Sequence, residues 1–86
     1  MRALIIDDEK KARNLLQVLL EENCPQITNI ESADNLPKGI KLIHSFKPDI
    51  VFLDIELPGY SGLQLLDFLT PEQINFEIIF TTAYSE

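Results

Sequence analysis

Two hydrophobic patterns alternate along the chain and predict the order of its secondary-structure elements. Short, continuous apolar runs occupy residues 3–6, 50–53 and 78–80, the last within a predicted strand over residues 77–81. Such runs are typical of strands buried on both faces of a parallel sheet. Residues 27–33 are more polar and predict a strand at an edge of that sheet.

Residues 9–23 follow a different period, with apolar side chains three or four positions apart. The apolar positions are Ala12, Leu15, Leu16, Leu19 and Leu20. This spacing predicts an amphipathic helix, which Pro25 ends because the residue before a proline disfavours helical geometry.

Two further helices are indicated by their first residues. Asn35 is suited to cap a helix over residues 36–46, and Pro37 fits its first turn, where a missing N–H group costs nothing. Ser61 and Gln64 have the spacing of a capping box and predict a helix that continues to about Leu69.

The resulting order is βαβαβαβ, which predicts an α/β protein with a parallel sheet, helices on both faces and right-handed crossovers. The 86 residues suffice for one small domain. They end shortly after the fourth strand, where the alternation predicts another helix. We therefore expect a C-terminally truncated piece of a longer protein.

Charge is distributed unevenly along the chain, whose net charge is −7. Residues 48–86 contain seven acidic side chains and no lysine or arginine, which argues against this domain binding nucleic acid. No apolar run approaches the ~20 residues of a membrane span, so no membrane partner is expected. A single cysteine is consistent with a reducing, cytoplasmic location.

Acidic and hydroxyl side chains follow three of the predicted strands. Asp7 and Asp8 follow the first, Asp54 follows the third, and Thr82 lies at the end of the fourth. Parallel strands direct their carboxyl ends to one edge of the sheet. If the first and third strands are neighbours, ~4.8 Å apart, the three carboxylates form a cluster that needs a cation or a retained proton. Hard oxygen ligands favour Mg²⁺.

Purely structural roles are the alternative for some of these residues. Asp8 and Glu9 fit equally well as acidic residues at the start of a helix. Thr82 by itself fits a β-forming residue that ends its strand. Asp54 is harder to explain in this way, because a lone carboxylate that follows a buried apolar run lies at the edge of the core.

Several motifs, read together, carry a family resemblance. They are Leu-Ile-Ile-Asp-Asp-Glu at 4–9, Pro-Asp-Ile-Val-Phe-Leu-Asp at 48–54, Pro58, Gly62 and Ile-Ile-Phe-Thr-Thr-Ala at 78–83. Over its whole length the chain resembles the receiver domain of two-component response regulators. The resemblance implies a single receiver domain over residues 1–86 with a flavodoxin-like, doubly wound sheet of strand order 2-1-3-4.

The resemblance also implies a role for each residue of the acidic cluster. Asp54 matches the phosphoacceptor, and Asp8 matches a direct Mg²⁺ ligand, with Asp7 acting through water. Glu56 stands where the family supplies a backbone carbonyl to the metal. Mg²⁺ is thus the implied cofactor.

Two further roles follow from the same resemblance. Thr82 matches the switch hydroxyl that moves toward the phosphoryl group, and Glu56 and Tyr84 occupy the positions that tune the lifetime of the acyl phosphate. The implied function is to accept a phosphoryl group from a sensor histidine kinase, or from a small phosphodonor, and to lose it by self-catalysed hydrolysis. The wording of residues 54–62 and 82–86 is most similar to regulators with a LytTR-type DNA-binding output domain.

The sequence departs from the family in one respect. Receivers have a fifth strand with a lysine that pairs with the phosphorylated aspartate, whereas the final lysine here is Lys47. A second hypothesis is therefore a receiver-like module that only binds or dimerises, through the surfaces that an absent strand and helices would uncover. A third is a Mg²⁺ phosphohydrolase of the haloacid-dehalogenase type, but it requires aspartate at Glu56 and leaves Asp7 and Asp8 unexplained.

Overall fold

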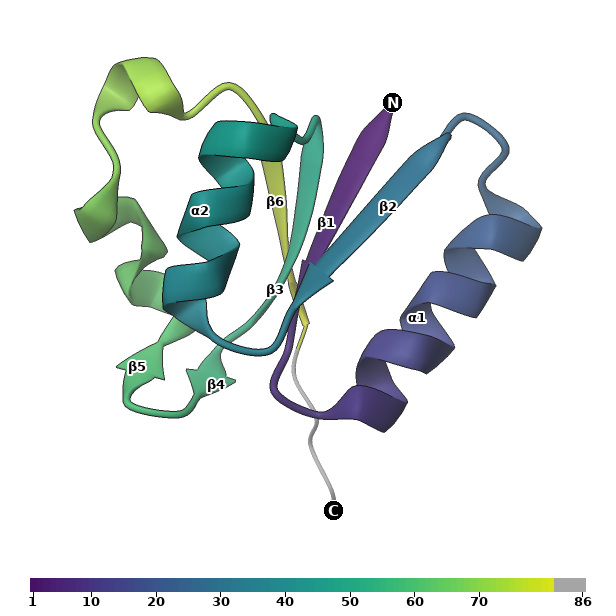
Figure 1. The fold of residues 1–86 in the computed structure, drawn as a ribbon, viewed down its shortest axis with the longest axis horizontal. Helices are drawn as coiled ribbons and strands as arrows, with labels where there is room; N and C mark the ends of the chain where they lie inside the picture. The colour runs from purple at the N-terminus through teal and green to yellow at the C-terminus, as the bar shows by residue number, and fades with distance from the viewer. Residues whose placement is uncertain (82–86) are drawn as a thin grey trace.

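A four-stranded parallel sheet organises the computed structural model, which describes residues 1–81 (Figure 1). Its strands are β1 (Arg2–Ile6), β2 (Asn29–Ala33), β3 (Ile50–Asp54) and β6 (Glu77–Thr81). They lie in the order β2-β1-β3-β6, and each pair is parallel. Since β6 is the fourth long strand along the chain, this order confirms the predicted 2-1-3-4 arrangement.

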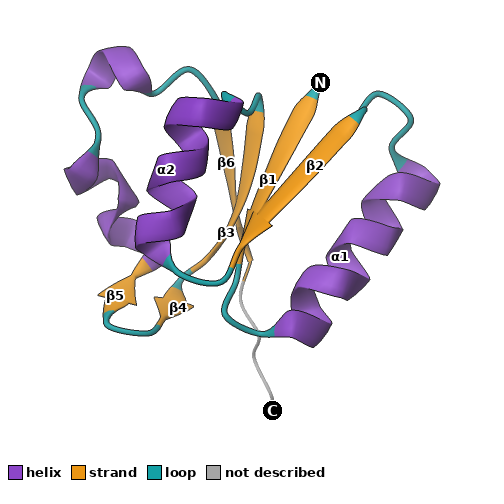
Figure 2. Ribbon diagram, in the orientation of Figure 1, coloured by secondary structure: helices purple, strands orange, loops and turns teal. Residues whose placement is uncertain are grey.

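Helices cover both faces of the sheet, as Figure 2 shows. Helix α1 (Lys10–Asn23) packs on one face, where Leu20 joins Ala3, Ile5 and Phe52. Helix α2 (Leu36–Phe46) and the 3₁₀ helix η1 (Gly62–Phe68) cover the other face through a larger cluster. The buried members of that cluster are Leu4, Ile6, Ala33, Leu36, Ile43, Val51, Leu53, Leu57, Leu65 and Leu69. Alternate residues of β1 and β3 thus serve opposite faces, as the period of a strand requires.

The predicted helix caps are present. The Asn35 side chain accepts a hydrogen bond from the Lys38 N–H at 2.9 Å, and α2 has the predicted bounds. The Ser61 N–H donates to Oε1 of Gln64 at 2.8 Å, and Ser61 Oγ accepts from the Leu63 N–H at 3.2 Å. The capping box begins the predicted helix, but the helix is of the 3₁₀ type and ends at Phe68. The cap does not distinguish the two helix types, because it satisfies the free N–H groups of either.

A short hairpin after Asp54 was not predicted. Strands β4 (Glu56–Leu57) and β5 (Tyr60–Ser61) pair antiparallel between β3 and η1. Gly59 allows this turn because its φ of 75° lies in the left-handed region, which residues with a side chain rarely adopt. The hairpin places Gly62, the first residue of η1, next to the end of β3.

Helix α1 buries less of its predicted apolar face than the sequence pattern indicates. Leu16 and Leu20 pack on the sheet, but Leu15 is 62% exposed and Leu19 is 46% exposed. Ile79 of β6 is also exposed. Within residues 1–81 the contact between α1 and the sheet covers only one side of the helix's apolar stripe. No helix in this described range is long and apolar enough to cross a membrane.

Two leucine substitutions test this assignment of the core. Leu4→Ala should lower the free energy of unfolding by about 3 kcal/mol, because Leu4 is fully buried between β2 and β3 and the lost side chain leaves a cavity. Leu15→Ala, the matched control on α1, should change it by less than about 0.5 kcal/mol. Urea denaturation measures both. Equal losses would contradict the placement of α1.

Candidate functional site: an acidic pocket at the carboxyl edge of the sheet

The pairing of β1 with β3 brings three carboxylates together. Ile6 lies opposite Leu53, so the next residues, Asp7 and Asp54, lie side by side at the carboxyl ends of β1 and β3, and Asp8 follows. One carboxylate oxygen from each of the three aspartates lies within 4.8 Å of the other two. The cluster predicted from the sequence is therefore present.

Asp7 is held by both its backbone and its side chain. Its N–H donates to the carbonyl of Ala33 at 3.1 Å, which extends the contact between β1 and β2 by one residue. Its Oδ1 accepts a hydrogen bond from the Glu9 N–H at 2.9 Å, just before α1 begins. Glu9 is the N-cap residue of α1, but its side chain makes no capping hydrogen bond, and Asp8 is exposed and leaves the pocket open to solvent.

Asp54 is the buried member of the cluster, with 8% of its surface exposed. Its Oδ1 accepts a hydrogen bond from the Glu56 N–H at 3.1 Å. Burial raises the pKa of the Asp54 carboxyl, the negative charges of Asp7 and Asp8 raise it further, and the bond from Glu56 opposes the rise. A proton or a cation in this pocket is therefore favoured.

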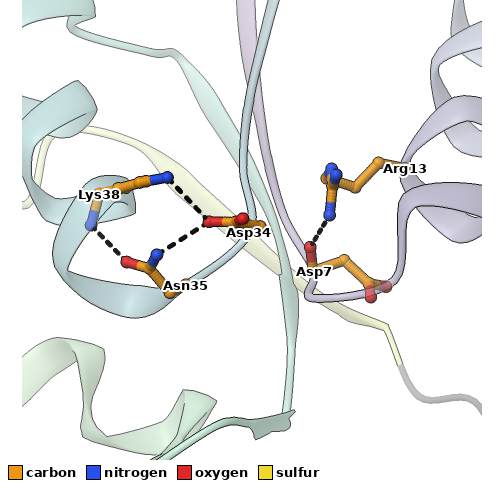
Figure 3. A network of polar contacts seen from close by, with 5 residues as sticks. All are labelled: Asp7, Arg13, Asp34, Asn35 and Lys38. Carbon is orange, nitrogen blue, oxygen red and sulfur yellow. Dashed lines mark hydrogen bonds and ion pairs between the residues drawn. The ribbon is translucent and has the colours of Figure 1, made fainter.

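Arg13 also belongs to the site, although the sequence pattern did not single it out. Its Nη1 donates to the carbonyl oxygen of Asp7 at 2.8 Å (Figure 3). Its position gives a usable signal, because Arg13 lies one helical turn beyond Glu9 and side chains on a helix tilt toward the N-terminus. Arg13 thereby ties α1 to the segment that carries two of the three carboxylates.

A second group of polar contacts lies just after β2, on the side of Asp7 away from Arg13 (Figure 3). Nζ of Lys38 lies 3.3 Å from Oδ1 of Asp34, and Asn35 Nδ2 donates to the same oxygen at 2.8 Å. The hydrogen bond and charge of Lys38 lower the pKa of Asp34. Because Asp34 and Lys38 are both exposed, their ion pair at the start of α2 contributes little to stability.

Of the other predicted site residues, the structure describes only Glu56. The side chain of Glu56 is exposed on β4 and lies outside the three-carboxylate cluster, whereas its N–H contacts Asp54. Thr82 and Tyr84 lie outside the described residues. Thr81, which pairs with Asp54 across β3 and β6, brings the chain to the same edge of the sheet as the acidic pocket.

The donor set of the pocket fits a hard divalent cation. Asp7, Asp8 and Asp54 offer only carboxylate oxygens, which Mg²⁺ prefers, and exposed Asp8 leaves space for the water ligands that Mg²⁺ retains. A cation here would also offset the repulsion among three like charges. The residues present therefore match the ion that the resemblance implies.

The comparison with protein families gives the class of protein. The family model of the response regulator receiver domain matches residues 3–86, and the chain belongs to this family. It is 48% identical over 86 residues to an uncharacterized response regulatory protein of Vibrio cholerae, covering 100% of this chain and 35% of that protein. It is 40% identical, with the same coverage, to the transcriptional regulatory protein BtsR of Escherichia coli K12. The chain thus spans about a third of the length of these relatives.

Solved structures show the same fold. The response regulator MaeR bound to beryllium trifluoride aligns with a TM-score of 0.87 at 26% identity, over 100% of this chain and 70% of that one. TrrA of Thermotoga maritima, in complex with Mg²⁺ and beryllium fluoride, aligns with a TM-score of 0.82 at 38% identity, over 98% of this chain and 70% of that one. The flavodoxin-like fold and the two-component class inferred from the sequence are confirmed.

The raised pKa of Asp54 predicts a pH-dependent gain in stability for Asp54→Asn. The folded chain holds the Asp54 proton more tightly than the unfolded chain, so this carboxyl lowers the free energy of unfolding as the pH rises from its ordinary pKa through the raised value. Asparagine has no such charge, so the variant should be more stable than wild type at neutral pH and gain nothing at a pH below the ordinary carboxyl pKa.

Urea denaturation at acidic and neutral pH, with a chelator present, measures this difference. Asp67→Asn is the matched control, because Asp67 is an exposed carboxylate on η1. A gain of the same size at both pH values would show that burial of the Asp54 charge is not its source.

Proposed function

We propose that this chain is a receiver domain in which Asp54 accepts a phosphoryl group from a phosphohistidine of a sensor histidine kinase. The observation that carries the proposal is the position of Asp54, which is the buried carboxylate among three that converge at the carboxyl edge of a receiver fold. The relation to response regulators supports the same role.

Mg²⁺ is the proposed cofactor of this transfer. Asp8 and Asp54 would bind it directly, Asp7 through water, and Glu56 through its backbone carbonyl. When bound, Mg²⁺ neutralises negative charge on the phosphoryl oxygens. The complex of TrrA with Mg²⁺ supports this assignment for a related fold.

The protein's own part in the transfer is nucleophilic attack by Asp54. A carboxylate oxygen of Asp54 forms a bond to phosphorus, and the bond between phosphorus and the kinase imidazole nitrogen breaks. The electron pair stays on that nitrogen, which then binds a proton. Water later attacks the acyl phosphate, releasing inorganic phosphate and restoring the carboxylate. The hydrogen bond from the Glu56 N–H to Asp54 Oδ1 orients the attacking group.

The response to phosphorylation is proposed to pass through the end of β6. Thr82 would supply the switch hydroxyl, and Glu56 and Tyr84 would set the lifetime of the acyl phosphate. The output is proposed to be transcriptional and of the LytTR type, in a part of the protein beyond this chain, and BtsR supports the transcriptional role. A partner histidine kinase with a cytoplasmic catalytic part implies a cytoplasmic receiver.

A receiver-like module that self-associates is the second candidate function. The exposed apolar residues of α1 and β6 favour it, because Leu15, Leu19, Ile79 and Phe80 are each more than two-fifths exposed. Such surfaces promote contact with another protein surface. A module that only associates has no need for a cation, so Mg²⁺ affinity distinguishes the two functions.

The proposed function is tested by intact-mass measurement after incubation with Mg²⁺ and acetyl phosphate. Wild-type protein should gain one phosphoryl group and Asp54→Asn none, because the amide cannot act as the nucleophile. Asp67→Asn should be labelled like the wild type. Labelling that survives in Asp54→Asn would assign the phosphoacceptor to another residue.

Calorimetric titration with Mg²⁺ complements the labelling experiment. The wild-type chain should bind one ion, and Asp8→Asn should weaken that binding by roughly tenfold or more, since the loss of one charged ligand lowers affinity steeply. Sedimentation velocity on the same samples reports association. Association without Mg²⁺ binding or labelling would favour the second candidate function.

A further inference from the structure

Gly62 lies against the backbone of the proposed phosphoacceptor. It is the first residue of η1 and is buried. A Cβ atom added at Gly62 would overlap the carbonyl oxygen of Asp54 and would lie 3.0 Å from both the Asp54 carbonyl carbon and the Ile55 Cα. All of these atoms belong to the backbone, so no side-chain rotation relieves the overlap: the peptide between Asp54 and Ile55 and the start of η1 must move apart.

Three hydrogen bonds hold the segment Asp54–Glu56, which contains this peptide. The Gly62 N–H donates to the Ile55 carbonyl at 2.6 Å, and the Ile55 N–H donates to the Thr81 carbonyl at 3.4 Å. The Glu56 N–H donates to the Asp54 carboxylate at 3.1 Å. The backbone of η1 thus contacts the segment that carries both Asp54 and the Glu56 carbonyl.

The other two glycines do not make such a contact. At Gly59 an added Cβ would meet nothing within 4 Å, although its φ of 75° disfavours any side chain. At Gly39 the three atoms nearest to an added Cβ would all belong to the Ile6 side chain. Contact with the Asp54 backbone therefore distinguishes Gly62 from Gly59 and Gly39.

We propose that Gly62 is a positioning residue for the acidic pocket. Its lack of a side chain lets η1 approach the peptide between Asp54 and Ile55, and this contact sets the position of the Asp54 carboxylate relative to Asp7 and Asp8. A side chain at position 62 displaces that peptide and separates the ligands, with no change in the ligands themselves. The proposal rests on the proposed function for the identity of the ion, but the geometric part concerns this chain alone.

Gly62→Ala tests the proposal, with Gly59→Ala as the matched control in the same hairpin region. Both variants should lower the free energy of unfolding, the first through the overlap and the second through strained backbone. Calorimetric titration of the folded proteins with MgCl₂ should show affinity lowered roughly tenfold or more in Gly62→Ala and nearly unchanged in Gly59→Ala, as expected when the support of a metal ligand is lost. Equal affinities in the two variants would overturn the proposal.

A metal-free measurement separates this proposal from the proposed function. Hydrogen exchange of the Glu56 amide, followed by NMR with a chelator present, reports the bond from that amide to Asp54. Exchange should be faster than wild type in Gly62→Ala and close to wild type in Gly59→Ala. This outcome would support the positioning role even if the wild-type chain bound no Mg²⁺, whereas equal exchange in both variants would overturn it.

If Gly62→Ala does not fold, the wild-type chain still decides the question. Binding of MgCl₂ should then slow exchange of the Gly62 amide, which donates to Ile55, more than exchange of the Lys38 amide, which donates to Asn35 at the distant cap of α2. Once calorimetry has shown that the wild-type chain binds Mg²⁺, an equal change at both amides, or no change at either, would show that Gly62 is not coupled to the pocket.

Discussion

The register that pairs Ile6 of β1 with Leu53 of β3 determines where the acidic side chains can lie. It is maintained from both faces of the sheet, because Leu4 and Ile6 pack under α2 while Ala3 and Ile5 pack toward α1. A slip of one residue would exchange these two sets of side chains between the faces. The packing of the apolar core therefore also fixes the separation of the carboxylates, although none of the carboxylates contributes apolar surface.

The acidic pocket brings three negative charges together at the edge of an apolar core, which is electrostatically unfavourable. Asp54 has the burial of a core residue and carries the charge of a surface residue, and the hydrogen bond from the Glu56 N–H offsets part of that cost. Folded frameworks tolerate such local costs where a site needs them, because the surrounding contacts are numerous. A ligand that binds only the folded pocket would return stability to the chain by mass action.

Local patterns predicted most of the framework, because strand runs and caps depend on neighbouring residues. The bounds of α2 and the capping box at Ser61 follow from a few adjacent side chains. The β4–β5 hairpin could not be predicted in this way, since strands of two residues are too short to show a period. The periodicity of α1 identified its apolar side but carried no information on how much of that side the sheet covers, and Leu15 is exposed. Arg13 was missed because its contact is to a backbone carbonyl, which residue types do not reveal, so that only its position one helical turn beyond Glu9 indicated it.

The three clustered carboxylates imply that ionic strength acts in opposite directions on the two reactants. Their negative field attracts a divalent cation from a distance and repels an anionic phosphodonor, and no lysine or arginine in residues 48–86 weakens it. Added salt screens both effects over a length of about 10 Å at 0.1 M. Encounter with the cation is therefore fastest in dilute buffer, whereas encounter with a small anionic donor becomes faster as salt is added.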